Sequence, residues 1–164
     1  MPTPTVGVLE LEVPTGWVAV PEVRWALGGE ARCRADGGDW RACGSPWRPA
    51  LAEGEHVVEV EVGAARGRAV VRVDRTPPEI SGLPGGALRG GLVVVRSLDA
   101  LSGVAGVACR LDGRPRACAL EVGALPEGEH RLEVVARDRA GNARRALGRF
   151  VVDRTPPVVS YAPP

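Results

Sequence analysis

The only two histidines of this 164-residue chain, His56 and His130, both end the tetrapeptide Glu-Gly-Glu-His. An imidazole could serve as a general base or as a metal ligand, but either role requires a nucleophile or further ligands nearby. The neighbours here are glutamate and glycine, and catalysis would need two identical sites. We interpret both histidines as capping backbone groups where a turn leads into a strand, and we predict no catalytic residue.

Oxygen ligands occur near several expected loops, at Asp99, Asp112, Asp138 and Asn142. Carboxylate and amide oxygens are the ligands that calcium prefers, so these residues are candidate calcium ligands. The spacing lacks the density of a calcium-binding loop, and Asp and Asn commonly stabilise turns by bonding their own backbone. We therefore predict no metal and no cofactor.

The four cysteines form two local pairs, Cys33 with Cys43 and Cys109 with Cys118. Zinc sites use closer spacings, so a disulfide within each pair fits better, with two pairs of free thiols as the alternative. Disulfides indicate an oxidising compartment, with the cytoplasm of hyperthermophiles as an exception.

Exposed aromatic and basic side chains are candidates for binding a partner. The candidates are Trp40, Trp47, Arg137, Arg139, Arg144 and Tyr161. An exposed Trp can anchor a protein or a sugar ring, and clustered Arg attracts acidic groups. The alternatives are that the tryptophans cover their own small core and that the arginines form a solvated strand edge.

Apolar residues alternate with polar ones wherever the pattern is clear, as in residues 57–62, where valines alternate with glutamates. This alternation predicts half-buried antiparallel strands. Further strands are expected at 9–13, 69–73, 92–95, 132–135 and 149–152. Pro, Gly and Asp-Gly signals interrupt the chain between them, which suits a sandwich or barrel. We therefore predict an all-β chain.

The segments between paired cysteines are expected to be hairpins. Pairing Cys109 with Cys118 centres the turn on Gly113-Arg114, and pairing Cys33 with Cys43 centres it on Gly38. In this arrangement each disulfide joins neighbouring strands of one sheet and does not tie two sheets together.

The pentapeptide Asp-Arg-Thr-Pro-Pro occurs at 74–78 and again at 153–157. The cysteine pairs and the Glu-Gly-Glu-His motifs repeat in the same order, so the chain contains two copies of one domain. Two prolines fix φ and remove N–H donors, which predicts a stiff, extended connection. We expect domains at 1–75 and 76–156, followed by a tail, or the start of a further repeat, at 157–164.

These motifs resemble bacterial immunoglobulin-like repeat domains, which occur in tandem in large surface-exposed and secreted proteins. In the first copy the resemblance rests on the Cys-bracketed Asp-Gly-Gly turn and the Leu-Ala-Glu-Gly-Glu-His run. In the second it rests on Asp-Ala-Leu-Ser-Gly-Val, Leu-Asp-Gly and Ala-Arg-Asp-Arg-Ala-Gly-Asn. The resemblance implies two immunoglobulin-like β-sandwiches. It leaves the function open between spacers, adhesive tips and appendages of enzymes or virions.

Composition and charge exclude several classes of function. All 21 basic side chains are Arg, a choice that is compatible with a thermophile, and the net charge is only +1. No global field favours nucleic acid, and no apolar stretch is long enough to cross a bilayer. The N-terminal residues lack the pattern of a signal peptide.

We expect a non-enzymatic structural or interaction module of an extracellular or cell-surface fibrous protein. Its partner would be another protein or a neighbouring subunit. The alternatives are a virion decoration, tail or fibre protein and a carbohydrate-binding accessory domain.

Overall fold

The computed structural model describes residues 7–161 and divides them into two compact units. The first unit runs to Pro77 and also includes the short segments Asp99–Gly103 and Asp138–Asn142, while the second contains the remaining residues from Pro78 onwards. The sequence prediction placed the division at 75/76 and assigned both short segments to the second domain. Residues 162–164 of the predicted tail lie outside the described residues.

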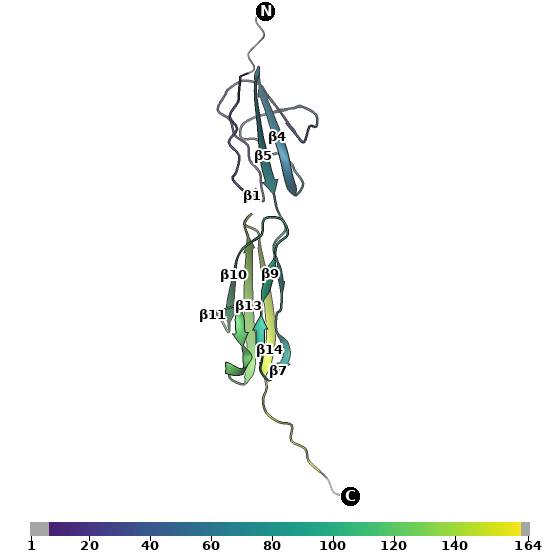
Figure 1. Ribbon diagram of the computed structural model, residues 1–164, viewed down its shortest axis with the longest axis vertical. Coiled ribbons are helices and arrows are strands. Elements are labelled where there is room, and N and C mark those ends of the chain that lie inside the picture. The colour runs from purple at the N-terminus through teal and green to yellow at the C-terminus, as the bar shows by residue number, and fades with distance from the viewer. Residues whose placement is uncertain (1–6, 162–164) are drawn as a thin grey trace, which may run out of the picture. The chain divides into compact units, whose positions relative to one another are not determined.

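The first unit contains one five-stranded sheet in the order β1-β5-β4-β2-β3, whose longest strands are labelled in Figure 1. Its strands are β1 (Trp17–Val18), β2 (Ala31–Ala35), β3 (Arg41–Cys43), β4 (Gly54–Val62) and β5 (Ala65–Val73). All pairings are antiparallel except that of β1 with β5. The burial of valines predicted for 57–62 is present, because Val58 and Val60 are fully buried, but Glu61 is buried as well, at 7% exposure.

The second layer of the first unit consists of isolated bridges. Glu12 pairs with Arg24, and Val23 pairs with Trp47. The strand expected at 9–13 is therefore wrong as a continuous element. The segment changes its pairing partner halfway. The Leu9 amide donates to the Arg66 carbonyl of β5, whereas Glu12 forms backbone hydrogen bonds with Arg24. Alternation alone does not reveal such a change of partner.

The second unit has a five-stranded sheet in the order β11-β10-β13-β14-β7 (Figure 1). Its elements are β6 (Glu79–Ser81), β7 (Gly85–Leu88), β8 (Leu92–Val94), β9 (Arg96–Leu98), β10 (Val104–Leu111), β11 (Arg114–Arg116), β12 (Ala119–Glu121), the short 3-10 helix η1 (Val122–Ala124), β13 (Gly128–Asp138) and β14 (Ala143–Val152). The facing layer pairs β6 with β9 and β8 with β12. Only Val95 separates β8 from β9, so these pairs form a second, interrupted sheet.

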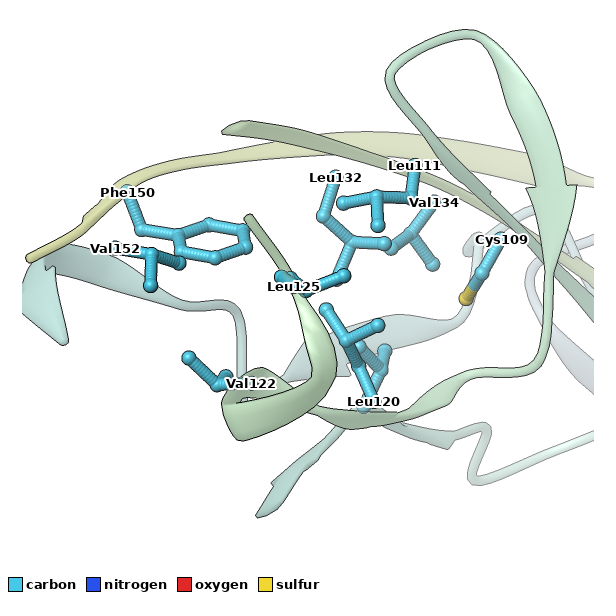
Figure 2. Close-up of a cluster of buried hydrophobic side chains, with 10 residues drawn as sticks. Cys109, Leu111, Leu120, Val122, Leu125, Leu132, Val134, Phe150 and Val152 are labelled. Atoms are coloured by element: carbon cyan, nitrogen blue, oxygen red, sulfur yellow. The ribbon is translucent and has the colours of Figure 1, made fainter. Parts of the chain in front are cut away.

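The core of the second unit lies between these layers. Figure 2 shows Leu132, Val134 and Phe150, from β13 and β14, facing Leu120 of β12 and Leu125, which follows η1. In the first unit the corresponding core contains Val23, Trp25, Val58, Val60 and Val71. Because both units place two β layers around one apolar core, the predicted all-β fold with two immunoglobulin-like sandwiches is confirmed.

The hairpin turns are not where cysteine pairing placed them. In the register of β10 and β11, Leu111 lies opposite Arg114, so the two-residue turn is Asp112-Gly113. The first unit has the same turn at Asp36-Gly37. Both aspartates have φ of 51° and both glycines also have positive φ, the conformation required by a tight hairpin turn that matches strand twist. The predicted turns at Gly113-Arg114 and Gly38 are therefore wrong.

Both predicted disulfides are present, with Cα–Cα distances of 5.9 Å for Cys33–Cys43 and 5.3 Å for Cys109–Cys118. Cys43 lies in β3 beside β2, so the first bridge joins neighbouring strands as expected. Cys118 follows β11 and immediately precedes β12. The second bridge therefore ties β10 of the large sheet to the segment entering the facing layer, which corrects the expectation for this copy.

Gly67 of β5 and Gly148 of β14 allow a crossing segment to pass close to the sheet. A Cβ on Gly67 would lie 2.5 Å from the Leu9 carbonyl oxygen, and one on Gly148 would lie 2.8 Å from the Pro84 carbonyl oxygen. We expect Gly67→Ala and Gly148→Ala each to lower the free energy of unfolding by about 2 kcal/mol, because the backbone must move apart. Denaturant titration measures the loss.

Gly106→Ala is the matched control for these substitutions. Gly106 also lies in a strand, β10, but no atom lies within 4 Å of the position of an added Cβ. Its replacement should therefore change stability by no more than about 0.5 kcal/mol. Equal losses at Gly67 and Gly106 would contradict the close-approach explanation.

Candidate functional site

Each Glu-Gly-Glu-His motif binds the Asp-Arg-Thr-Pro-Pro motif that follows the last strand of its own copy. In the first copy, Glu53 accepts hydrogen bonds from the Arg75 amide at 2.6 Å and from the Thr76 hydroxyl at 2.8 Å. The Arg75 guanidinium donates to the Leu51 carbonyl oxygen at 2.8 Å. We call this set of contacts the glutamate clamp.

The second copy repeats the glutamate clamp. Glu127 accepts the Arg154 amide at 2.7 Å and the Thr155 hydroxyl at 3.4 Å, and the Arg154 guanidinium donates to the Leu125 carbonyl oxygen at 2.8 Å. The two motifs therefore recur together because they are physically bonded. Each clamp fixes the first residues of the exit segment on the copy that the chain is leaving.

Each histidine is held between a carboxylate and a backbone carbonyl. His56 Nδ1 lies 2.6 Å from an Asp36 carboxylate oxygen, and its Nε2 lies 2.9 Å from the Ala52 carbonyl oxygen. In the second copy the distances are 2.8 Å to Asp112 and 2.9 Å to the Pro126 carbonyl oxygen. The predicted capping of backbone is confirmed. The carboxylate partner was missed, because it is the turn Asp of a distant hairpin.

Neither the carboxylate nor the carbonyl has a proton to donate. The imidazole therefore hydrogen-bonds best to both when both of its nitrogens carry protons. The hydrogen bond to Asp36 raises the pKa of His56, aided by the Ala52 carbonyl. For His130 the Pro126 carbonyl is the larger cause of a raised pKa, followed by Asp112. The pKa of Asp36 is lowered by His56 and by the Val57 amide.

We expect each histidine pair to stabilise the fold most in mildly acidic solution. A histidine with a raised pKa contributes stability below its unfolded value of about 6.5, and this contribution is lost as the pH rises through the folded pKa. The lowered pKa of Asp36 adds stability that is lost only as the pH falls through its folded value, below about 3.8. The unfolding free energy should therefore decline from about pH 6 upwards.

The double substitution His56→Gln and His130→Gln tests this dependence. Glutamine keeps hydrogen-bonding capacity but does not titrate, so the decline above about pH 6 should disappear. Urea titrations from pH 5 to 9 provide the measurement. An unchanged pH profile in the variant would show that other groups cause the decline.

Asp74, the first residue of the first Asp-Arg-Thr-Pro-Pro motif, is completely buried. Its carboxylate accepts the Thr76 amide and the Ser102 amide, both at 3.0 Å. Its own amide donates to the Val18 carbonyl oxygen, and its carbonyl oxygen accepts from the Asn142 side-chain amide at 3.0 Å. Of the four polar groups of this residue, one is thus satisfied within its own segment and three by three separate stretches of chain.

The two short segments of the first unit shape the surroundings of Asp74. Asp99 accepts the Gly103 amide at 2.7 Å, and Asp138 accepts the Asn142 amide at 2.8 Å and its side-chain amide at 2.7 Å. These bonds hold each segment as a closed turn. A further bond, from the Arg139 amide to the Gly103 carbonyl oxygen, joins the two segments.

Asp74, Asp99 and Asp138 each place one carboxylate oxygen within 4.8 Å of the others. Oxygens at such separations could ligate a hard cation such as Ca²⁺, which takes oxygen ligands at about 2.4 Å. Of the oxygen ligands considered from sequence, Asp99, Asp138 and Asn142 come together, whereas Asp112 pairs with His130. Asp74 was missed, since its motif was interpreted only as punctuation. The prediction that no metal binds stays a prediction.

The candidate partner-binding residues differ in how far they are exposed. Trp40 is half-buried beneath Arg34, whose guanidinium carbon lies 4.5 Å from the ring centroid, and Trp47 packs against the first core. Within residues 7–161, Arg137, Arg139 and Arg144 are exposed and make no ion pair. Tyr161 is 81% exposed in the tail. Their roles in binding stay predictions.

Comparison with known proteins finds similar solved structures but no similar sequence. No protein-family model and no curated protein matches the sequence. Solved structures that resemble it include the fibronectin(III)-like modules of CbhA from Clostridium thermocellum, with a TM-score of 0.43, 13% identity and coverage of 94% of this chain and 100% of that one.

Two further similar structures are tandem immunoglobulin domains. Titin domains I67–I69 align with a TM-score of 0.46 at 11% identity, covering 88% of this chain and 64% of that one. Sidekick-1 immunoglobulin domains 1–4 align with a TM-score of 0.43 at 13% identity, covering 89% and 49%. Within residues 7–161, no helix has the length and apolar character needed to cross a membrane.

Proposed function

We propose that this chain is a non-enzymatic structural segment of an extracytoplasmic fibrous or surface protein, in which tandem sandwiches set a spacing. The observation that carries the proposal is the glutamate clamp, which is built from the same residue types in both copies. A clamp that fixes the exit segment, followed by two prolines, limits the directions in which the chain can leave each sandwich. Such restriction is what a spacer requires.

The distribution of reactive side chains supports the same role. Both histidines are engaged by a carboxylate and a carbonyl, and all four cysteines form disulfides. One local disulfide in each small sandwich is the usual reinforcement of domains in oxidising compartments, where modest cores benefit from covalent closure. The polar groups that looked chemically active in the sequence therefore serve to hold backbone.

The proposal is tested by locating the natural protein in its source and mapping its cysteines. Peptide mapping without reduction should recover Cys33–Cys43 and Cys109–Cys118 linked in the surface or secreted fraction. External protease should release peptides of this chain from intact cells. Recovery of the protein with alkylatable thiols from the cytoplasm would overturn the proposal, and recovery only within virus particles would replace it with the virion alternative.

A further inference from the structure

We propose that the second Asp-Arg-Thr-Pro-Pro motif, at Asp153–Pro157, is a preformed docking site for another sandwich of the second type. The inference rests on the proposed role of the chain as a tandem structural segment and names the partner of that segment. By the second type we mean a sandwich that carries the turns Asp-Ala-Leu-Ser-Gly and Asp-Arg-Ala-Gly-Asn. In this chain those turns are Asp99–Gly103 and Asp138–Asn142.

Asp153 makes the same local hydrogen bonds as Asp74. The Asp153 amide donates to the Leu88 carbonyl oxygen at 3.0 Å, as the Asp74 amide does to Val18. The Thr155 amide donates to the Asp153 carboxylate at 3.0 Å, the distance found between Thr76 and Asp74. With the repeated glutamate clamp, the two motifs share their bonds from the Asp, Arg and Thr amides, the Arg guanidinium and the Thr hydroxyl to their own copies.

The difference between the two motifs lies in the contacts that other segments supply. Asp74 is fully buried, with its second carboxylate oxygen on the Ser102 amide and its carbonyl oxygen on the Asn142 side chain. Asp153 is exposed, and among residues 7–161 no donor reaches its second carboxylate oxygen or its carbonyl oxygen. The site is therefore formed but lacks the two turns that complete it at Asp74.

The chemistry of these groups selects the partner. The two acceptors require a backbone N–H and a side-chain amide held at fixed positions, which the Ser-Gly and Ala-Gly-Asn turns of a second-type sandwich provide. The first copy cannot provide them, because it has Val62-Gly-Ala-Ala-Arg-Gly67 where the second copy has the Asp138–Asn142 turn. The turns of this chain's own second copy already bind Asp74. The partner is therefore a further sandwich of the second type. Because the site is preformed, little ordering of this side of the contact is required.

A three-copy chain tests the inference. A second copy of residues 79–157 is fused after Pro157, and amide hydrogen exchange is followed at the serine equivalent to Ser102 in the added copy. We expect this amide to exchange about tenfold or more slowly than in the same chain carrying Asp153→Ala, because a hydrogen bond to a carboxylate is lost. Asp74→Ala is the matched control, and it should speed exchange at the original Ser102 only.

Three outcomes would overturn the inference. The first is an added copy whose core amides are protected but whose serine amide exchanges fast regardless of Asp153. The second is an added copy that fails to fold, since the same sequence folds after Pro78 here. The third is concentration-dependent self-association of the original chain that Asp153→Ala abolishes, which would make a second copy of this chain the partner. None of these outcomes alters the cellular location or the disulfides on which the proposed function is tested.

Discussion

Asp74→Ala is expected to lower the free energy of unfolding of the first unit by about 3 kcal/mol, because it leaves the buried Ser102 amide without an acceptor and also removes a bond to Thr76. Tryptophan fluorescence in a denaturant titration measures this loss. All four tryptophans lie between Trp17 and Trp47, so the signal reports the first unit. Far-UV circular dichroism follows both units in the same samples.

Asp153→Ala is the matched control, since it removes the same residue from the same motif with the same local bonds. Its carboxylate is exposed, so water replaces the lost hydrogen bond to Thr155 and the stability should change little. Comparable losses for the two variants would mean that the motif is stabilised locally and that the contacts of Asp74 with Ser102 and Asn142 contribute nothing.

Removal of either disulfide is expected to cost about 2.5–3 kcal/mol, as calculated from the closure of a loop of about ten residues. The paired substitution Cys33→Ala with Cys43→Ala should shift the fluorescence transition. Cys109→Ala with Cys118→Ala should shift the circular dichroism transition of the second unit and leave fluorescence in place. A small core has few other contacts with which to absorb such a loss.

The two disulfides also differ in a way that denaturation can resolve. The first links neighbouring strands that remain hydrogen bonded without it, whereas the second links β10 to the segment entering the facing layer. Loss of the second should therefore raise hydrogen exchange in β8 and β12 before global unfolding. Equal protection of these strands with and without the bridge would show that core packing alone holds the layers together.

Local patterns predicted much of the fold. The alternation of valine with charged residues identified β4, β5, β13 and β14, because a half-buried strand exposes every second side chain. The disulfides were predicted from the sequence spacing of the paired cysteines, which is too wide for a zinc site and short enough for a hairpin.

The errors arose where local symmetry was mistaken for strand register. Centring the turn between two cysteines assumed that they lie directly opposite each other, but Cys109 pairs with Arg116 and Cys118 lies beyond the hairpin. The Asp-Gly sequence, which favours positive φ at both turn positions, was the better signal. The strand at 9–13 failed for a related reason, because alternation does not show which partner a segment follows.

By itself, the sequence determined that the chain is a tandem repeat of two all-β sandwiches, each with a local disulfide, because these properties depend on nearby residues and on a repeated order of motifs. The tertiary structure decided what the repeated motifs do. Glu53 reaches Arg75, Asp36 reaches His56, and Asp74 reaches Ser102 and Asn142 only after the strands between them have paired. Hydrogen bonds between residues 20 to 68 positions apart leave no periodic trace in a sequence. Only the structure, therefore, distinguished the buried Asp74 from the exposed Asp153 in an identical pentapeptide.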